Sequence, residues 1–208
     1  MPSSSYLPNK MIFFIVKFIC TLCLGLSGVT AVGAIVATPT PHALSVRYPE
    51  AYMRFIPAAE KQKPHWLVIS PEQGILLLDE NLRTRTILNV KAELLDSRAN
   101  AASSDMVFAT IVEPGHVPTL FSVDVAGGKI NEVMHLPVPG YQVESLCLQR
   151  DIAGNLYAYL LDERGIAEHW LVLDGHGKAL ARHMRNLPIP PNSKACSVDD
   201  TSASLYIA

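Results

Sequence analysis

Short apolar segments separated by polar turns follow one another from Trp66 to the end of the chain. No stretch keeps the apolar period of an amphipathic helix over a useful length, so the pattern predicts strands. The clearest unit has four expected strands, at residues 145–149, 156–161, 169–173 and 179–184. Each turn between them begins with Asp and contains Gly, which supplies the positive φ of tight reversals. Four antiparallel strands joined in this way form one propeller-type blade.

Two earlier units and one later unit repeat this organisation. The earlier ones include expected strands at 66–70 and 75–78, and at 106–112 and 120–124, and the later one begins at Ala195. An Asp closes one apolar strand in each of the first three units, with spacings of 45 and 50 residues. These residues are Asp79, Asp124 and Asp174. We expect their carboxylates to accept hydrogen bonds from backbone N–H groups of the turns that follow.

The last third of the chain also repeats itself. Leu136-Pro-Val-Pro returns as Leu187-Pro-Ile-Pro, and four further residue pairs lie 49 positions apart. These pairs are Cys147 and Cys196, Asp151 and Asp200, Leu156 and Leu205, and Tyr157 and Tyr206. A repeat of 40 to 50 residues built from short strands is typical of propeller blades. The sequence therefore predicts an all-β fold, a partial β-propeller of about three and a half four-stranded antiparallel blades.

The chain divides into an export segment, a lead-in and the blades. Lys10 and Lys17 precede the uncharged apolar run 18–37, so residues 1–37 are interpreted as a cleaved signal peptide or as an uncleaved membrane anchor. Residues 38–64 are rich in Pro and Ala and predict a linker or irregular lead-in, and residues 65–208 form the partial propeller. Either interpretation of the first segment predicts an exported protein, periplasmic or secreted. The apolar, strand-like end at 205–208 predicts that the polypeptide is the leading part of a longer chain.

Composition narrows the chemistry. The net charge is −2 with acids and bases interspersed, which gives no indication of nucleic-acid binding, and a membrane contact is expected only if the first segment stays uncleaved. Outside the export segment the cysteines are Cys147 and Cys196. A disulfide between them is allowed in an oxidising compartment. Their equivalent positions place them on inner strands of different blades, so we expect two separate buried side chains.

Several segments resemble one known family in order and spacing. They include Val143-Glu-Ser-Leu-Cys-Leu-Gln-Arg-Asp, Leu156-Tyr-Ala-Tyr-Leu-Leu-Asp-Glu-Arg-Gly, Ala195-Cys-Ser-Val-Asp-Asp and Leu205-Tyr-Ile-Ala. This run is similar to the β-propeller phytases, and Leu95-Asp-Ser-Arg98 resembles an Asp-x-Arg element of that family. The resemblance covers about the first half of the family's propeller. It implies calcium as cofactor and the release of phosphate from inositol hexakisphosphate.

Carrying the family's site over residue by residue leaves few candidates. Arg164 lies one position from a family Lys and can reach phosphate, although the favoured alternative is an ordinary solvated turn residue. Glu144 begins an inner strand and can face a central channel, the alternative being a polar strand-end residue. Asp199-Asp200 matches a family motif, yet Asp200 repeats Asp151, so we expect a turn role.

The family's metal-binding residues are largely replaced. Lys194 stands where a metal-binding Glu is usual, and a cation there repels calcium. The sequence thus assigns two substrate-binding candidates, Glu144 and Arg164, with no catalytic residue and no metal ligand. The histidines are scattered without metal-ligand spacing.

Two functions follow from these residues. The first is a phytase-like phosphomonoester hydrolase acting on inositol phosphates. Because the family's metal-binding acids are largely replaced, we expect residues 1–208 alone to be inactive. The second is a non-catalytic accessory or binding half-propeller that precedes a complete catalytic propeller, its partner being that downstream domain.

Overall fold

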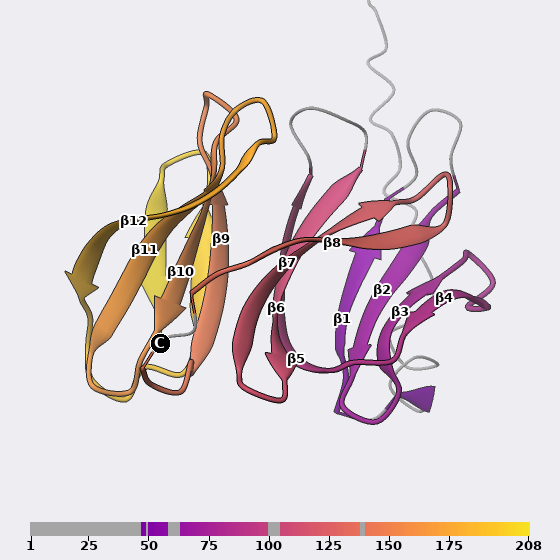
Figure 1. The fold of residues 1–208 in the computed structure, drawn as a ribbon, viewed down its shortest axis with the longest axis horizontal. Helices are drawn as coiled ribbons and strands as arrows, with labels where there is room; N and C mark the ends of the chain where they lie inside the picture. The colour runs from indigo at the N-terminus through magenta and orange to yellow at the C-terminus, as the bar shows by residue number, and fades with distance from the viewer. Residues whose placement is uncertain (1–46, 49, 58–62, 100–104, 138–139) are drawn as a thin grey trace, which may run out of the picture. The chain divides into compact units, whose positions relative to one another are not determined.

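A computed structural model describes residues 47–48, 50–57, 63–99, 105–137 and 140–208. The described residues form fourteen strands in three four-stranded antiparallel sheets and one two-stranded sheet (Figure 1). This pattern confirms the predicted three and a half blades. The expected export segment lies outside the described residues. Among the residues that are described, no helix is long and apolar enough to span a membrane.

Each blade is a meander in which consecutive strands pair. Blade 1 contains β1 (Tyr52–Ile56), β2 (His65–Ser70), β3 (Gly74–Leu78) and β4 (Thr84–Leu88). Blade 2 contains β5 (Lys91–Ala99), β6 (Met106–Glu113), β7 (Val117–Asp124) and β8 (Lys129–His135). Blade 3 contains β9 (Ser145–Arg150), β10 (Leu156–Leu161), β11 (Ile166–Leu173) and β12 (Ala179–Pro188). The half-blade contains β13 (Cys196–Asp199) and β14 (Ser204–Ile207).

The lead-in predicted to be irregular contains the first strand. β1 pairs with β2 in antiparallel register, Phe55 opposite Trp66, and the two rings lie 5.1 Å apart. The sequence pattern missed β1 because Tyr52 and Arg54 are exposed and only Ile56 is buried. The pairing with the buried strand β2, rather than an apolar run of its own, makes this segment a strand.

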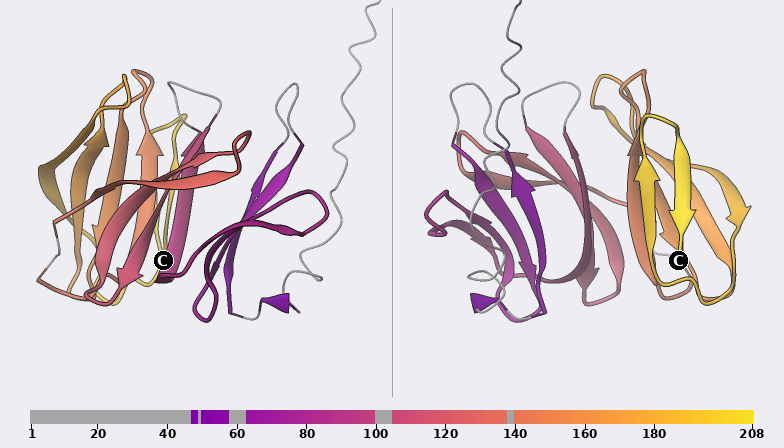
Figure 2. Two further views of the ribbon diagram at one scale, coloured as in Figure 1. Left: turned by 45° about the vertical axis from the view of Figure 1, so that its right-hand side comes forward. Right: turned by 180° about the vertical axis from the view of Figure 1, so that it is seen from behind.

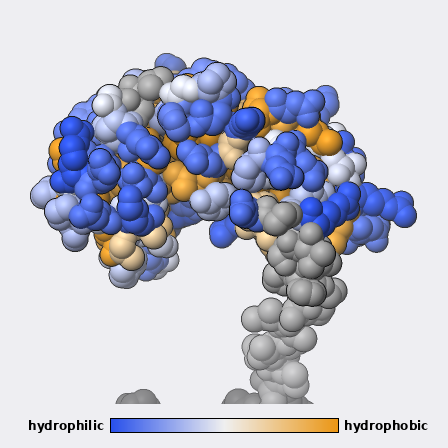
Figure 3. All heavy atoms as spheres, turned by 90° about the horizontal axis from the view of Figure 1, so that it is seen from below, coloured by the Kyte–Doolittle hydropathy of each residue, from blue (hydrophilic) through white to orange (hydrophobic). Residues whose placement is uncertain are grey.

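The middle strands of each blade are apolar because they are covered on both faces. Every residue of β3 is buried, whereas the outermost strand β12 has no buried residue. Continuous apolar runs are expected for strands packed between two layers, and polar ones for strands at an edge. The face of the molecule shown in Figure 3 is accordingly mostly hydrophilic, and hydrophobic side chains show as separate patches.

Apolar clusters between neighbouring sheets hold the blades together. One joins blades 1 and 2, with Leu67 and Ile69 packed near Phe108 and Phe121. A second joins blades 2 and 3, and a third joins blade 3 to the half-blade. A blade therefore buries its faces only through its neighbours, as expected for repeat architectures.

The turn chemistry is as predicted. The Oδ1 atoms of Asp79, Asp124 and Asp174 each accept at least one backbone N–H bond from the turn that follows, at 2.7 to 3.0 Å. In blade 3, Gly165 has φ +101°, and a Cβ there would lie 2.8 Å from the carbonyl oxygen of Ile189. Only glycine satisfies both requirements at this turn.

Candidate functional site

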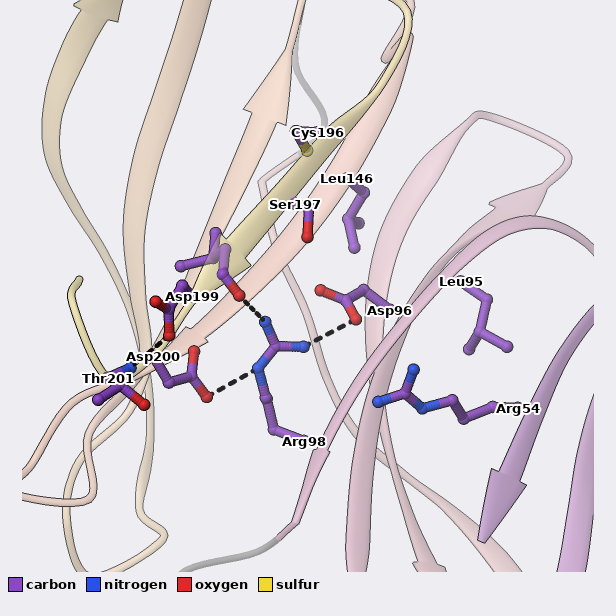
Figure 4. A pocket seen from close by; sticks show the side chains of 11 residues that line it. Arg54, Leu95, Asp96, Arg98, Leu146, Cys196, Ser197, Asp199, Asp200 and Thr201 are labelled. Carbon is purple, nitrogen blue, oxygen red and sulfur yellow. Dashed lines mark hydrogen bonds and ion pairs between the residues drawn. The ribbon is translucent and has the colours of Figure 1, made fainter. Parts of the chain in front are cut away.

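Four inner strands, one from each blade and the half-blade, contribute to a cavity of about 490 Å³. Its charged lining consists of two arginines and three aspartates. Arg54 comes from β1, Asp96 and Arg98 from β5, and Asp199 and Asp200 from the end of β13. Figure 4 shows Arg54 and Arg98 pointing into the space toward the acidic side chains.

The Arg98 guanidinium bonds to three inner strands at once. Its Nε donates to Asp200 Oδ2 at 2.9 Å, and its Nη1 donates to Asp96 Oδ1 at 2.8 Å. Its Nη2 donates to the carbonyl oxygens of Leu148 on β9 and Val198 on β13, at 2.6 and 3.2 Å. With only 15% of its side chain exposed, Arg98 is a charge-assisted link between blades 2 and 3 and the half-blade.

The two carboxylates of this network have further backbone partners. Asp96 Oδ2 accepts the N–H of Leu148 at 2.8 Å, and Asp200 Oδ1 accepts the N–H of Arg150 at 3.1 Å. Both carboxylates are therefore occupied by donors from the protein itself. Asp96 and Arg98 lie two residues apart on β5, the spacing that puts side chains on one face of a strand.

The turn role predicted for Asp200 is wrong, and Asp199 has that role instead. Asp199 Oδ1 accepts the N–H of Thr201 at 2.9 Å, and its Oδ2 accepts the hydroxyl of Ser202 at 2.7 Å. The repeat aligns Asp200 with Asp151, whose Oδ1 does accept turn N–H groups. The attraction of Arg98, which lies 102 residues earlier, directs the Asp200 carboxylate toward the cavity instead.

The expectation of two unlinked cysteines is also wrong, because Cys147 and Cys196 form a disulfide with a Cα–Cα distance of 6.0 Å. The premise was correct, since Cys147 lies on β9 and Cys196 on β13, the inner strands of successive blades. Inner strands of successive blades lie close together, and the distance is within the usual range for a disulfide. Equivalent positions in a repeat thus favour the bond rather than oppose it.

Glu144, a predicted substrate-binding residue, forms an ion pair. Its Oε2 lies 2.6 Å from the Nζ of Lys194, and its side chain is largely buried. Lys194 was expected to repel calcium, and the structure shows which carboxylate it neutralises. The pair links the segment before β9 to the segment before β13.

Arg164, the other predicted substrate-binding residue, is also paired. Its guanidinium lies 2.9 Å from Asp162 Oδ2 and 5.7 Å from the centre of the Tyr141 ring. Burial opposes ionisation of Asp162, but hydrogen bonds from Ile166 N–H and Arg164 outweigh it and lower the pKa of this carboxyl. Glu144 lies near the same turn, because its N–H donates to the carbonyl oxygen of Leu161. Substrate binding by Glu144 and Arg164 stays a prediction.

A calcium cluster of the kind implied by the family resemblance does not fit the inner-strand residues. Calcium requires six to eight oxygen ligands, mostly from carboxylates and carbonyls. Asp96 and Asp200 are bonded to Arg98, and Glu144 is bonded to Lys194. The Arg98 guanidinium and the Lys194 ammonium thus neutralise the carboxylates that a divalent cation would need as ligands.

One other group of side chains has the geometry of a ligand set. Atoms of Glu93, Glu113 and His116 all lie within 4.8 Å of one another. Two carboxylates and an imidazole suit zinc better than calcium. His116 Nδ1 already lies 2.8 Å from Glu113 Oε1, so a His–Glu ion pair explains the grouping. The sequence did not reveal it, because Glu93 comes from β5 and joins the others only through the pairing of β5 with β6.

A buried histidine lies on the face of blade 3 that carries the disulfide. His169 stacks on Tyr159 with ring centres 4.5 Å apart, and both of its ring nitrogens are buried without a hydrogen-bond partner among the described residues. Burial, together with the nearby Arg185 and His183, lowers the pKa of His169 to about 4. The ring is therefore neutral in the folded protein at pH 7.

This histidine gives a prediction on pH dependence. The unfolded chain binds a proton at His169 near pH 6.5 and the folded protein only near pH 4, so stability falls as the pH decreases between these values. We expect His169→Phe, which keeps the stacking, to reduce this fall. Urea unfolding of both proteins from pH 7 to pH 4 measures it. Equal pH dependence in the two proteins would contradict the assignment.

Comparisons with known proteins bear on the fold. No family model matches the chain, and neither does any curated protein. The structure of Sqt1 from Saccharomyces cerevisiae gives a TM-score of 0.52 at 12% identity, covering 75% of this chain and 42% of that chain. A putative exo-beta-1,3-galactanase from Bifidobacterium bifidum s17 gives a TM-score of 0.37 at 11% identity, covering 64% of this chain and 48% of that chain. A humanized mutant of the Chaetomium thermophilum Polycomb Repressive Complex 2 gives a TM-score of 0.34 at 10% identity, covering 70% of this chain and 44% of that chain.

The likeness to Sqt1 concerns the fold alone. Together with the sheet pattern it shows a partial β-propeller. The chain spans less than half the length of each of these solved chains.

Proposed function

We propose that this chain is a non-catalytic half-propeller that acts as an accessory module, packing against further β-sheet structure. The observation that carries the proposal is the pairing of acids on the inner strands. Arg98 forms ion pairs with Asp96 and Asp200, and Lys194 forms one with Glu144. Calcium-dependent phosphate release of the phytase type needs such carboxylates free to hold hard cations.

The charge of the cavity argues in the same direction. Two arginines face three aspartates there, so the lining carries no excess of positive charge. A hexakisphosphate is recognised by several cations acting together. The remaining basic candidate, Arg164, is bonded to Asp162. These features favour the accessory role over phytase catalysis.

The disulfide supports an exported location as part of this proposal. Disulfides persist in secreted and periplasmic proteins and are rare in reducing compartments. The bond between Cys147 and Cys196 joins blade 3 to the two-stranded sheet of β13 and β14. An exported accessory module is consistent with both features.

Phosphate release tests the proposal. The purified chain is incubated with inositol hexakisphosphate and calcium and then with a chelator, beside an active β-propeller phytase, with folding checked by near-UV circular dichroism. We expect no release from the folded chain under either condition. Calcium-dependent release that Glu144→Gln abolishes, while Glu132→Gln on β8 leaves it intact, would overturn the proposal in favour of a working phytase site.

A further inference from the structure

Three side chains with metal-binding groups converge on blade 2. Glu93 lies near the start of β5, Glu113 ends β6, and His116 lies in the turn before β7. None of the three lines the cavity around Arg98. Blade 2 lies between blades 1 and 3, as both views of Figure 2 show, and it shares an apolar cluster with each of them. The group therefore belongs to a blade that has both of its neighbours.

The pairing of β5 with β6 brings the two carboxylates to one face of the sheet. Glu93 is opposite Ile111, and Glu113 follows Ile111 by two residues. Side chains two residues apart on a strand share a face, as do those opposite each other on paired strands. The turn after β6 then returns His116 to within contact of Glu113. The arrangement thus depends on strand register, and a run of acids in the sequence does not explain it.

The distances between the three groups suit a tetrahedral ion. His116 Nδ1 lies 2.8 Å from Glu113 Oε1 and 3.6 Å from Glu93 Oε1. Ligand atoms about 2.0–2.2 Å from a tetrahedral zinc ion lie roughly 3.3–3.6 Å from one another. Small side-chain rotations therefore suffice to place all three atoms around one ion. Between 31% and 48% of each side chain is exposed, so water has access to the fourth position.

The charge of the group is not balanced within the protein, because one imidazole cannot neutralise two carboxylates. Glu113 pairs with His116, and Glu93 has no other cationic partner within the described ranges. Lys91, opposite Glu113 in the register, is exposed and forms no ion pair with either carboxylate. With a neutral His116 ring, two negative charges remain close together. A divalent cation between them compensates both.

Blade 2 also contains a Glu–His pair that lacks a third ligand. Glu132 Oε1 lies 3.0 Å from His135 Nε2, and these residues are again three positions apart. The other ring nitrogen of His135 is hydrogen-bonded to the hydroxyl of Thr119. Among the described residues, no further carboxylate joins this pair in a metal-binding geometry. Glu132 and His135 thus have the chemistry of the Glu113–His116 ion pair without that of a metal site.

We propose that Glu93, Glu113 and His116 bind a zinc ion, with water as the fourth ligand. Imidazole and carboxylate groups are usual zinc ligands, whereas calcium takes six to eight oxygen atoms. The ion replaces the proton that the Glu113–His116 ion pair requires, and that proton is released to solvent on binding. The bound ion links β5 to the turn between β6 and β7. The site does not include the paired acids on which the proposed function rests, so each proposal is tested without the other.

Metal titration of the full chain tests the proposal. All proteins carry Cys20→Ser and Cys23→Ser, because thiolates at these two positions would also bind zinc. Zinc and calcium binding are measured by calorimetry. Cobalt, which adopts the tetrahedral geometry of zinc, is followed by its visible absorption. We expect a single zinc ion to bind, a tetrahedral cobalt band that zinc abolishes, and calcium binding that is roughly tenfold weaker or worse.

Removal of the third ligand distinguishes a metal site from an ion pair. Glu93→Gln keeps the Glu113–His116 pair but is expected to weaken zinc binding roughly tenfold or more and to abolish the cobalt band. Glu132→Gln, the matched control, should change neither. Near-UV circular dichroism establishes that each variant is folded. Absence of zinc binding by the folded chain, unchanged binding in Glu93→Gln, or an equal loss in Glu132→Gln would each overturn the proposal.

Discussion

Loss of the Cys147–Cys196 disulfide is expected to lower the free energy of unfolding by about 4 kcal/mol, a large share of a domain's stability. The bond closes a loop between residues 49 apart. It stabilises the fold by lowering the conformational entropy of the unfolded chain. It also ties the half-blade, which contributes only two strands, to blade 3. We expect β13 and β14 to detach first when the bond is cut.

Denaturant unfolding with and without reductant measures this effect. The double variant Cys147→Ala/Cys196→Ala is the matched control, since it lacks the bond under both conditions and should not respond to reductant. Hydrogen exchange of the backbone amides tests detachment of the half-blade, because the amides that pair β13 with β14 lose their protection when these strands open. An unchanged midpoint on reduction of the natural chain would show that the disulfide does not stabilise the fold.

Replacing Arg98 by Met is expected to cost about 2–3 kcal/mol, below the range for a fully buried ion pair because Asp200 keeps 34% of its side chain exposed. The variant removes the guanidinium that bonds to the carboxylates of both Asp96 and Asp200. It also leaves the carbonyl oxygen of Leu148 without the guanidinium donor. Arg98→Lys should recover only part of the loss, because one ammonium cannot span positions that the planar guanidinium reaches together.

Arg54 provides the matched control for Arg98. It lines the same cavity but is exposed and has no ion pair in the part of the chain that the structure describes. We expect Arg54→Met to change stability by no more than about 0.5 kcal/mol, as for surface substitutions away from specific contacts. Similar losses for both variants in urea unfolding would mean that the Arg98 bonds do not carry the stabilisation.

The same two features also predict coupling. Arg98 reaches Asp200, and the disulfide holds Cys196 four residues earlier, so both fix β13 against the inner strands. Contributions that restrain one element are not additive. Arg98→Met and reduction of the disulfide, applied together, should therefore lower the free energy of unfolding by less than the sum of their separate effects.

The sequence alone determined the inner and middle strands of most blades, their grouping into repeats and the turns, but not β1, which lies in the lead-in that was predicted to be irregular. Polar turns beginning with Asp and containing Gly fix where strands end, and these signals are local. The prediction for 156–161 coincides with β10, whereas β12 continues to Pro188, beyond the predicted end at residue 184. The extension is an edge strand without apolar alternation, so it follows from pairing with β11 rather than from its own pattern.

Tertiary structure alone decided which side chains meet. The repeat showed that Cys147 and Cys196 are equivalent but gave no distance between successive inner strands, so the bond was not predicted. Asp200 and Asp151 occupy equivalent positions yet differ in role, because only Asp200 has Arg98 from another blade within reach. Local sequence specifies hydrogen bonds within a turn, whereas ion pairs and disulfides between blades depend on how successive sheets pack, and that packing brings together residues far apart in the chain.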